Sequence, residues 1–281
     1  MNKLKKNILS LPPLSQLVSE SQLTFRKSLG QNFIYDINLT RKIARQAKPL
    51  DSGSVIEVGP GPGALTRALL IEGAREVIAI EKDARAIKIL SQLEELAHPR
   101  LKIINGDALK IELTSLGNSP RQIVANLPYN IATRLIIDWL QTSNNLAAIT
   151  VMVQREVAKR LCAEHGDPDY GRLAVIVRLL AEPNLLFEVP AAAFIPKPKV
   201  TSAVVQLLPR NEPLFKVDML SLEKITRAAF GKRRKMLRSS LKEFGGTRLL
   251  EQAYIPPTER PENLTVESFC RLADLYSSQT H

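Results

Sequence analysis

Four residues in the middle of the chain combine side chains that could hold a nucleobase: Asn126, Leu127, Pro128 and Tyr129. They directly follow the apolar run 123–125, which is typical of a buried strand in a parallel sheet. Ligands of open parallel sheets bind beyond the carboxyl ends of the strands. An Asn amide can pair with the amino edge of adenine, and a Tyr ring can stack on a base. The four residues therefore predict a site that grips a base by its exocyclic amine.

A glycine-rich turn and two acidic residues predict a nucleotide site at the same edge of the sheet. Gly59 and Gly61 lie in the turn 57–63 between a predicted strand and a predicted helix, where glycine permits close approach of the backbone to a ligand. Glu81 ends the next strand, where an acid binds ribose hydroxyls in nucleotide-binding α/β folds, and Asp107 ends the third strand and could accept from an adenine amine. The GxGxG spacing and the absence of a GxxxxGK(S/T) motif favour S-adenosylmethionine over NAD. The alternative is a turn needed only for packing, with both acids capping helices or facing solvent.

Predicted strands alternate with predicted helices through the first half of the chain, which indicates βαβ units and a mostly parallel sheet. The expected elements are helices over 36–48, 64–72 and 83–97, and strands over 55–58, 76–80, 101–104, 122–125 and 148–153. Two helices, over 156–163 and 173–181, and two strands, over 185–189 and 202–208, are expected to follow. Because no helix separates the last two strands, we expect an antiparallel pair at the edge of the sheet.

The pattern divides the chain into three parts. Residues 1–22 are basic, and a pair of prolines interrupts their short apolar stretch, so we expect a flexible basic tail rather than a signal peptide. Residues 23–210 contain the α/β pattern, whereas residues 211–281 show only helical patterns and turns. We therefore expect an α/β domain followed by a small helical C-terminal domain.

The composition indicates a basic globular protein with an anionic partner. The 281 residues include 39 Lys and Arg but 28 Asp and Glu, a net charge of +11 that favours nucleic acid or an anionic membrane surface as the partner. No apolar run approaches the roughly 18 residues of a spanning helix, so we expect no membrane partner. Cys162 and Cys270 lie far apart and outside any metal-binding motif, which favours reduced thiols in the cytoplasm and no metal site.

The basic residues concentrate near the start of the helical domain. Between Lys224 and Lys242 the chain has eight basic residues and no acidic one. Basic side chains neutralise RNA phosphates without reading sequence, and the alternative is a solvated helix face. The residues expected to bind RNA are Lys232, Arg233, Arg234, Lys235 and Arg238. Others that could extend this surface are Arg155, Lys159, Arg160, Lys197 and Lys199.

No side chain near the 126–129 motif is an obvious general base, so we expect catalysis by positioning and electrostatics. The Asn126 side-chain oxygen and the backbone carbonyl of Leu127 or Pro128 would accept the two hydrogens of an adenine amine and direct its lone pair at a methyl group. Tyr129 would stack on a base flipped out of its loop. Phe194 would cover the other face of the base, or alternatively would only pack a loop.

Four motifs resemble those of the ribosomal RNA adenine dimethyltransferases, and the resemblance covers about residues 24–280. They are residues 27–34 (KSLGQNFI), 57–61 (EVGPG), 126–131 (NLPYNI) and 194–200 (FIPKPKV). The resemblance implies a Rossmann-like class I S-adenosylmethionine-dependent methyltransferase with a helical RNA-binding domain, which we expect to be a cytoplasmic monomer. By motif match, the residues implied to contact the cofactor are Asn32, Ile34, Gly59, Gly61, Glu81, Asp107 and Asn126.

The resemblance also implies a substrate, the exocyclic amines of two adjacent adenines in the hairpin loop near the 3′ end of small-subunit rRNA. Dimethylation there would be linked to biogenesis of the small subunit. Segment 27–33 together with Leu127 and Asn130 favours the small-subunit type over the large-subunit type that confers macrolide resistance. A ribosome-assembly factor with secondary or absent catalysis is a second hypothesis. An NAD enzyme is a third, disfavoured by the glycine spacing.

Overall fold

The computed structural model describes residues 3–21, 23, 31–47, 49–142, 145–231 and 235–280, which form two compact units. The sheet unit comprises Met1–Ala158 and Asn184–Pro209, and the helical unit comprises Lys159–Pro183 and Arg210–His281. The sequence predicted that the helical domain begins at residue 211, whereas the helical unit also includes an earlier segment. The reason is packing: helix α8 (Arg172–Leu180), which lies in that segment, contacts two later helices, α9 and α12.

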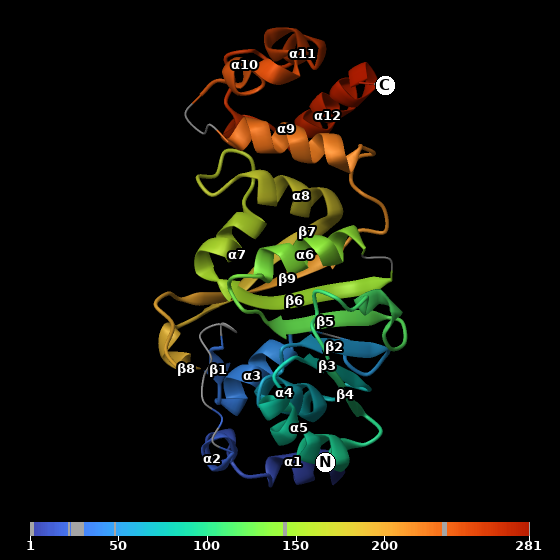
Figure 1. The fold of residues 1–281 in the computed structure, drawn as a ribbon, viewed down its shortest axis with the longest axis vertical. Helices are drawn as coiled ribbons and strands as arrows, with labels where there is room; N and C mark the ends of the chain where they lie inside the picture. The colour runs from blue at the N-terminus through green and yellow to red at the C-terminus, as the bar shows by residue number, and fades with distance from the viewer. Residues whose placement is uncertain are drawn as a thin grey trace. The chain divides into compact units, whose positions relative to one another are not determined.

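The sheet has seven strands in the order β4-β3-β2-β5-β6-β9-β7 (Figure 1). The neighbouring pairs from β4 to β6 are parallel, and β9 runs antiparallel to β6. Strands β2 and β3 are buried along their whole length, as in sheets covered on both faces. The predicted mostly parallel sheet with an antiparallel edge is therefore confirmed. In chain order the strands are β2 Ser54–Val58, β3 Val77–Glu81, β4 Leu101–Asn105, β5 Arg121–Asn126, β6 Leu146–Gln154, β7 Ala181–Val189 and β9 Ser202–Pro209.

The helices of the sheet unit begin and end at residues suited to those positions. The Asp36 carboxylate accepts from two backbone N–H groups at the start of α3, and Asp83 caps α5. Helix α4 begins after Gly63 and ends before Gly73, both in the left-handed conformation that glycine favours. The helices are α1 Lys3–Leu9, α2 Leu14–Glu20, α3 Ile37–Ala44, α4 Ala64–Glu72, α5 Ala84–Ala97 and α6 Ala132–Gln141, and α7 Arg155–Cys162 follows.

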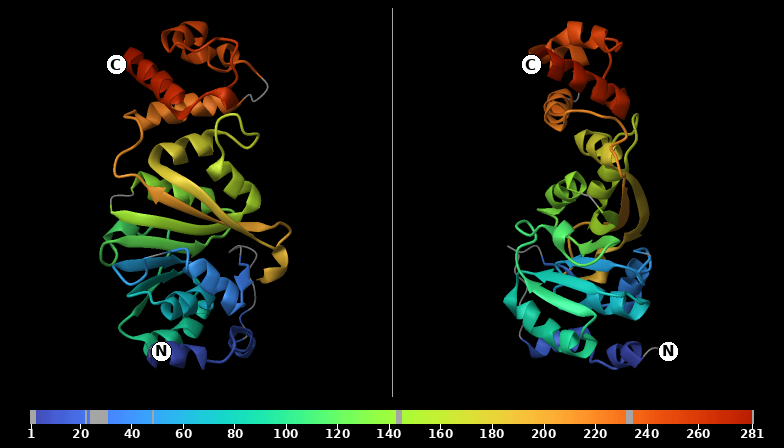
Figure 2. Two further views of the ribbon diagram at one scale, coloured as in Figure 1. Left: turned by 180° about the vertical axis from the view of Figure 1, so that it is seen from behind. Right: turned by 90° about the vertical axis from the view of Figure 1, so that its right-hand side faces the viewer.

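The N-terminal segment differs from the expected flexible tail, because its described residues form α1 and α2. Helix α1 packs against α4 and α5, and the views in Figure 1 and Figure 2 show the three helices side by side. Ile8 and Leu14 are buried, and the Arg67 Nη1 donates to the Pro12 carbonyl oxygen at 2.9 Å. Apolar residues spaced along the segment thus bury against the sheet unit, which the interrupting prolines concealed.

The helical unit packs around a cluster of aromatic rings. Tyr170 and Phe230 meet edge to face at 5.9 Å between ring centroids, and Phe230 lies 5.4 Å from Phe269. Besides α8, the helices here are α9 Met219–Gly231, α10 Leu237–Ser240, α11 Gly246–Gln252 and α12 Val266–Thr280. None of the described helices of the chain combines the length and the apolar character that a membrane crossing requires.

The central strand β2 contains a buried carboxyl group. Glu57 is 1% exposed, and its Oε2 has no hydrogen-bond partner among the described residues. Burial raises the pKa of Glu57 to about 8; the charge of Glu81 adds to the rise, whereas the hydroxyl and N–H of Thr66 oppose it. The Glu57 carboxyl is therefore mostly protonated at neutral pH.

The Glu57→Gln substitution should change how stability depends on pH. Because the folded-state pKa lies above the ordinary value of 4.5, protonation of Glu57 stabilises the fold fully below that pH, and the contribution is lost as pH rises toward 8. Over that window the free energy of unfolding should fall less steeply with pH in the variant, by at most about 1.4 kcal/mol per pH unit. Urea titrations measure the slope. The exposed Glu182→Gln is the control, and equal slopes for Glu57→Gln and the wild type would contradict the argument.

The end of α11 contains a strained tyrosine. The Tyr254 N–H donates to the Glu251 backbone carbonyl oxygen at 3.0 Å, and the Ile255 N–H donates to the Leu250 carbonyl oxygen at 2.9 Å. These two bonds form the Schellman pattern. Tyr254 has φ 57°, in the left-handed region where glycine is usual, and its side chain is 86% exposed. Little packing therefore offsets the backbone strain.

The Tyr254→Gly substitution should stabilise the protein by about 0.5–1 kcal/mol, because glycine removes the strain at a modest entropic cost in the unfolded chain. Chemical denaturation measures the change in the free energy of unfolding. Tyr254→Ala is the matched control, since it removes the ring but keeps the Cβ that causes the strain. If the alanine variant is as stable as the glycine variant, the strain is not the cause.

Candidate active site

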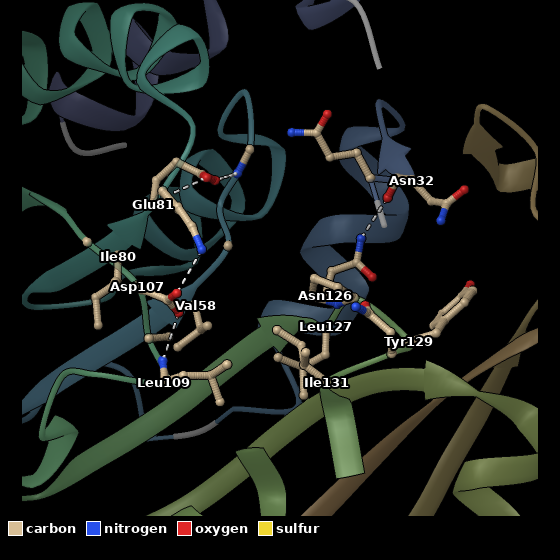
Figure 3. Close-up of a pocket in the computed structure, with 18 of the residues that line it drawn as sticks. Asn32, Val58, Ile80, Glu81, Asp107, Leu109, Asn126, Leu127, Tyr129 and Ile131 are labelled. Carbon is tan, nitrogen blue, oxygen red and sulfur yellow. Dashed lines mark hydrogen bonds and ion pairs between the residues drawn. The ribbon is translucent and has the colours of Figure 1, made fainter. Parts of the chain in front are cut away.

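A pocket of about 220 Å³ lies in the sheet unit at the carboxyl ends of the four parallel strands β2 to β5 (Figure 3). Its walls include apolar side chains from Val58, Ile80 and Leu109, and polar groups converge on it from opposite sides. The structure places these predicted site residues in its lining: Asn32, Gly59, Gly61, Glu81, Asp107, Asn126, Leu127, Pro128 and Tyr129. The sequence predicted that acids and glycines from successive strands meet at one edge of the sheet, and the structure brings them together there.

The two glycines of the turn have different surroundings. Both adopt positive φ, 68° at Gly59 and 55° at Gly61. A Cβ on Gly59 would meet no protein atom within 4 Å, so its backbone presents an open face beside the pocket. A Cβ on Gly61 would lie 2.5 Å from the Phe33 ring, so this glycine is required by packing. Close approach of a ligand to the backbone is therefore possible at Gly59.

Glu81 is held rigidly at the end of β3. Its Oε2 accepts from the Gly61 N–H at 2.9 Å, and its Oε1 accepts from the Lys82 and Asp83 N–H groups at 2.7 and 2.8 Å. The side chain is 8% exposed. A carboxylate has about four acceptor sites, so one remains for a ligand hydroxyl after these three bonds.

Asp107, at the other side of the pocket, is paired with Lys82, a partner not predicted from the sequence. The Lys82 Nζ lies 2.7 Å from Asp107 Oδ2, and the Leu109 N–H donates to Oδ1 at 3.1 Å. These contacts, led by the bond from Lys82, hold the pKa of Asp107 below its usual value. The strand order could have predicted this pair. Lys82 directly follows β3, Asp107 follows β4, and these two strands are parallel neighbours.

The orientation of the Asn126 amide is set by the N-terminal part of the sheet unit. Its Nδ2 donates to the Asn32 carbonyl oxygen at 3.0 Å. The segment after Asn32 is strand β1 (Phe33–Ile34), which pairs antiparallel with β8 (Phe194–Ile195). Because the amide nitrogen is engaged, the Oδ1 of Asn126 is the atom available to accept a hydrogen from a ligand.

Tyr129 is tethered through its hydroxyl. The phenol oxygen lies 2.8 Å from the Ser202 Oγ at the start of β9. Ser202 is fully buried, and burial raises the pKa of Tyr129. Ser202 could not be predicted from the sequence, because its hydrogen bond joins residues 73 positions apart and leaves no local signal.

Two predicted residues lie outside this pocket. Phe194 is 2% exposed and belongs to the hydrophobic core with Ile34, so its ring packs in the core here and does not line the pocket. Within β8 the side chain of Phe194 is buried, whereas that of Ile195 is exposed. Ile34 is also buried, and it is the backbone of this segment that could face a ligand.

The residues expected to bind RNA are only partly described. Lys232, Arg233 and Arg234 lie outside the described residues, as does the part of the 27–34 motif before Gln31. Lys235 and Arg238 are exposed in the helical unit, and in the sheet unit Lys197 and Lys199 are exposed. Within the described ranges, no group of acidic, Cys or His side chains could hold a metal ion.

Comparison with known proteins agrees with this geometry. The model of the family "Ribosomal RNA adenine dimethylase" matches residues 22–278. The chain is 51% identical over 271 residues to ribosomal RNA small subunit methyltransferase A of Paramagnetospirillum magneticum, with 96% of each chain covered. It is 50% identical over 269 residues to the protein of that name from Agrobacterium fabrum, which covers 94% of this chain and 97% of that protein.

Two solved structures have similar folds. A dimethyladenosine transferase from Plasmodium falciparum is 27% identical with a TM-score of 0.71, over 85% of this chain and 95% of that chain. The 23S rRNA methyltransferase ErmE is 29% identical with a TM-score of 0.66, over 88% of this chain and all of that chain. With a family match over nearly its whole length and relatives at half identity, the chain belongs to the ribosomal RNA adenine dimethylase family.

Proposed function

We propose that this protein transfers methyl groups from S-adenosylmethionine to the exocyclic amines of two adjacent adenines in the hairpin loop near the 3′ end of small-subunit rRNA, in the cytoplasm, during small-subunit biogenesis. The observation that carries the proposal is the Asn126 amide, fixed with its acceptor oxygen available at a nucleotide-sized pocket. Relatives named as small-subunit methyltransferases, about half identical over nearly the whole chain, support the choice of RNA.

The pocket suits an adenosyl cofactor. Glu81 offers a fixed acceptor to ribose hydroxyls, and the apolar side chains of Ile80 and Leu109 form walls for a base. Asp107 could accept from the adenine amine if that amine replaces the Lys82 ammonium at Oδ2. The open face of Gly59 leaves room for the remainder of the molecule. When bound, the cofactor supplies an electrophilic methyl group on a sulfonium.

Two acceptors would hold the target amine. The Asn126 Oδ1 is one, because Nδ2 is used by Asn32. For the second, the backbone favours Leu127 over Pro128, since the Pro128 carbonyl oxygen already accepts from the Ile131 and Ala132 N–H groups, each at 3.2 Å. Acceptors on both N–H bonds draw the amine nitrogen from planarity toward a tetrahedral shape, so that its lone pair can attack. The proton leaves to water after transfer.

The Tyr129 ring would stack on the flipped adenine. Its tether to Ser202 limits rotation of the ring, so less conformational entropy is lost when a base stacks. The exposed basic residues would add affinity that depends on salt and not on sequence.

The Asn126→Ala variant should lose methyl transfer by about 100-fold or more, because one of the two acceptors is removed. Purified wild-type protein with S-adenosylmethionine should dimethylate adenines in small-subunit rRNA or its assembling subunit, read by mass spectrometry. Cofactor binding to the variant should remain detectable by titration. Asn118→Ala is the matched control, because Asn118 is exposed in the loop that precedes β5, at the opposite end of the strand from Asn126.

Near-normal turnover by Asn126→Ala would exclude this mechanism. Large-subunit rRNA, assayed in parallel, distinguishes the proposed substrate from the one named for ErmE. Tight binding of assembling subunits by a wild-type protein that methylates neither RNA would favour an assembly factor.

The Ser202→Ala variant should raise the KM for RNA about three- to tenfold and leave the KM for the cofactor unchanged, because the Tyr129 ring is no longer restrained. Tyr129→Phe breaks the same bond from the other side. A double-mutant cycle with RNA as the varied substrate tests the link. If the two residues act through this bond, the double variant resembles either single one, and additive effects would refute the tether.

A further inference from the structure

The helical unit contains a second cavity, which the proposed reaction does not use. It measures about 230 Å³, similar in size to the pocket of the sheet unit. Its lining comes from four separate segments of this unit: Glu164, His165 and Tyr170, then Arg178 of α8, then Arg210 and Leu214, and finally Val266 of α12. Glu164 and His165 are exposed and form its rim, whereas Tyr170 is 2% exposed and forms part of its buried wall.

Arg178 holds the rim in place. Its Nε donates to the Ala163 carbonyl oxygen and its Nη2 to the Cys162 carbonyl oxygen, both at 2.6 Å, and Nη2 lies 3.0 Å from Glu164 Oε1. The Gly166 N–H donates to the Glu262 backbone carbonyl oxygen at 2.8 Å, which connects the same loop to the segment before α12. The cavity is therefore built before any ligand arrives.

The opposite wall is fixed by backbone bonds to the end of α8. The Arg210 N–H donates to the Leu180 oxygen at 2.8 Å, and the Leu214 N–H donates to the Leu179 oxygen at 2.9 Å. These bonds position the Arg210 side chain beside the cavity. The wall, like the rim, needs no ligand to form.

Two of the residues that line this cavity, Tyr170 and Arg210, each carry a buried hydrogen-bond donor without a partner among the described residues. The Tyr170 hydroxyl and the Arg210 Nε are each shielded from solvent and make no hydrogen bond to the described residues. Buried polar groups are nearly always paired, so an unpaired buried phenol and guanidinium N–H at one cavity indicate an acceptor from outside the chain.

The acceptor that fits is an anion. The lining holds two guanidinium groups against a single carboxylate, Glu164, which is already paired with Arg178. A phosphate group offers several acceptor oxygens for a phenol and an arginine, and charge-assisted bonds of this kind are the strong ones. Leu214 and Val266 add apolar wall against which a sugar could lie.

We propose that this cavity binds a backbone phosphate of the rRNA substrate, so that the helical unit anchors the RNA at a defined point. This rests on the proposed function. RNA is favoured over a free anion because the Tyr170 ring packs on Phe230 near the end of α9, and the exposed basic residues Lys235 and Arg238 follow that helix in the same unit. RNA attracted by these two residues would bring its backbone phosphates to this unit.

The sharpest test is Tyr170→Phe, which removes the unpaired hydroxyl and no charge. If the hydroxyl binds phosphate, the affinity for small-subunit rRNA should fall about five- to tenfold and the KM for RNA should rise equally, with kcat unchanged at saturating RNA. The thermal midpoint should stay the same or rise, because a buried unpaired group is lost. A structural role would produce the opposite, a lower thermal midpoint with unchanged RNA affinity, and would overturn the proposal.

Arg210→Gln tests the second donor and should weaken RNA binding about tenfold. Arg248→Gln is the charge-matched control, since Arg248 is exposed on α11 of the same unit and does not line the cavity. Equal losses in the two variants would indicate only general electrostatic attraction and would overturn the cavity as a site.

Inorganic phosphate supplies the remaining arm of the test. At constant ionic strength, phosphate should raise the thermal midpoint of the wild type more than chloride does, and the difference should vanish in Arg210→Gln. A phosphate response without any change in RNA affinity would assign the cavity to a free anion and overturn the RNA proposal. Failure of the wild-type protein to bind or methylate rRNA would instead refute the proposed function itself.

Discussion

The hydrogen bond from Asn126 Nδ2 to the Asn32 carbonyl oxygen is the constraint on which the candidate active site depends. An Asn amide has a donor end and an acceptor end, and only the acceptor end can receive a hydrogen from an adenine amine. By occupying the donor, Asn32 determines which end a base meets. Rotation of the amide would place two N–H groups against the N–H groups of the substrate and remove the proposed catalytic arrangement.

That hydrogen bond is supported by contacts distant in the sequence. The carbonyl of Asn32 directly precedes β1, which pairs with β8 through the register Phe33 with Ile195 and Ile34 with Phe194. Phe194 is buried in the core and anchors this small ribbon. On the far side, Gln31 Nε2 donates to Asp83 Oδ2 at 3.0 Å, so the strand approaching the pocket is also tied to the start of α5. Phe194 thus acts on the site through the backbone it holds.

The parts of the site that could be predicted from sequence follow from a single geometric rule, and the parts that could not depend on long-range pairing. The carboxyl ends of parallel strands meet at one edge, so Gly59, Glu81 and Asp107 could be placed together from strand order alone. The rule does not say which way a side chain turns, so Phe194 was assigned to the pocket although its ring lies in the core.

Helix α6 (Ala132–Gln141) follows the motif at 126–129 and was not predicted, although its buried residues Ala132, Leu135, Ile136, Trp139 and Leu140 recur at helical spacing. Its start explains why the Pro128 carbonyl oxygen is occupied, since the first N–H groups of a helix need acceptors. The N-terminal helices were hidden by the prolines between them. The tether of Tyr129 to Ser202 joins strands that only the sheet order brings together.

The two acidic residues nearest the glycine turn, Glu57 and Glu81, have different surroundings at the same edge of the sheet. Glu57 is the second-last residue of β2 and Glu81 ends the parallel neighbour β3, so full ionisation of both would place two negative charges in a buried region. Three backbone N–H groups converge on the Glu81 carboxylate, whereas the Oε2 of Glu57 receives none. The donors thus fix the orientation of the Glu81 carboxylate, which lines the pocket, whereas burial disfavours negative charge at Glu57. The turn that brings the Gly61 N–H to Glu81 therefore determines where a carboxylate faces the pocket.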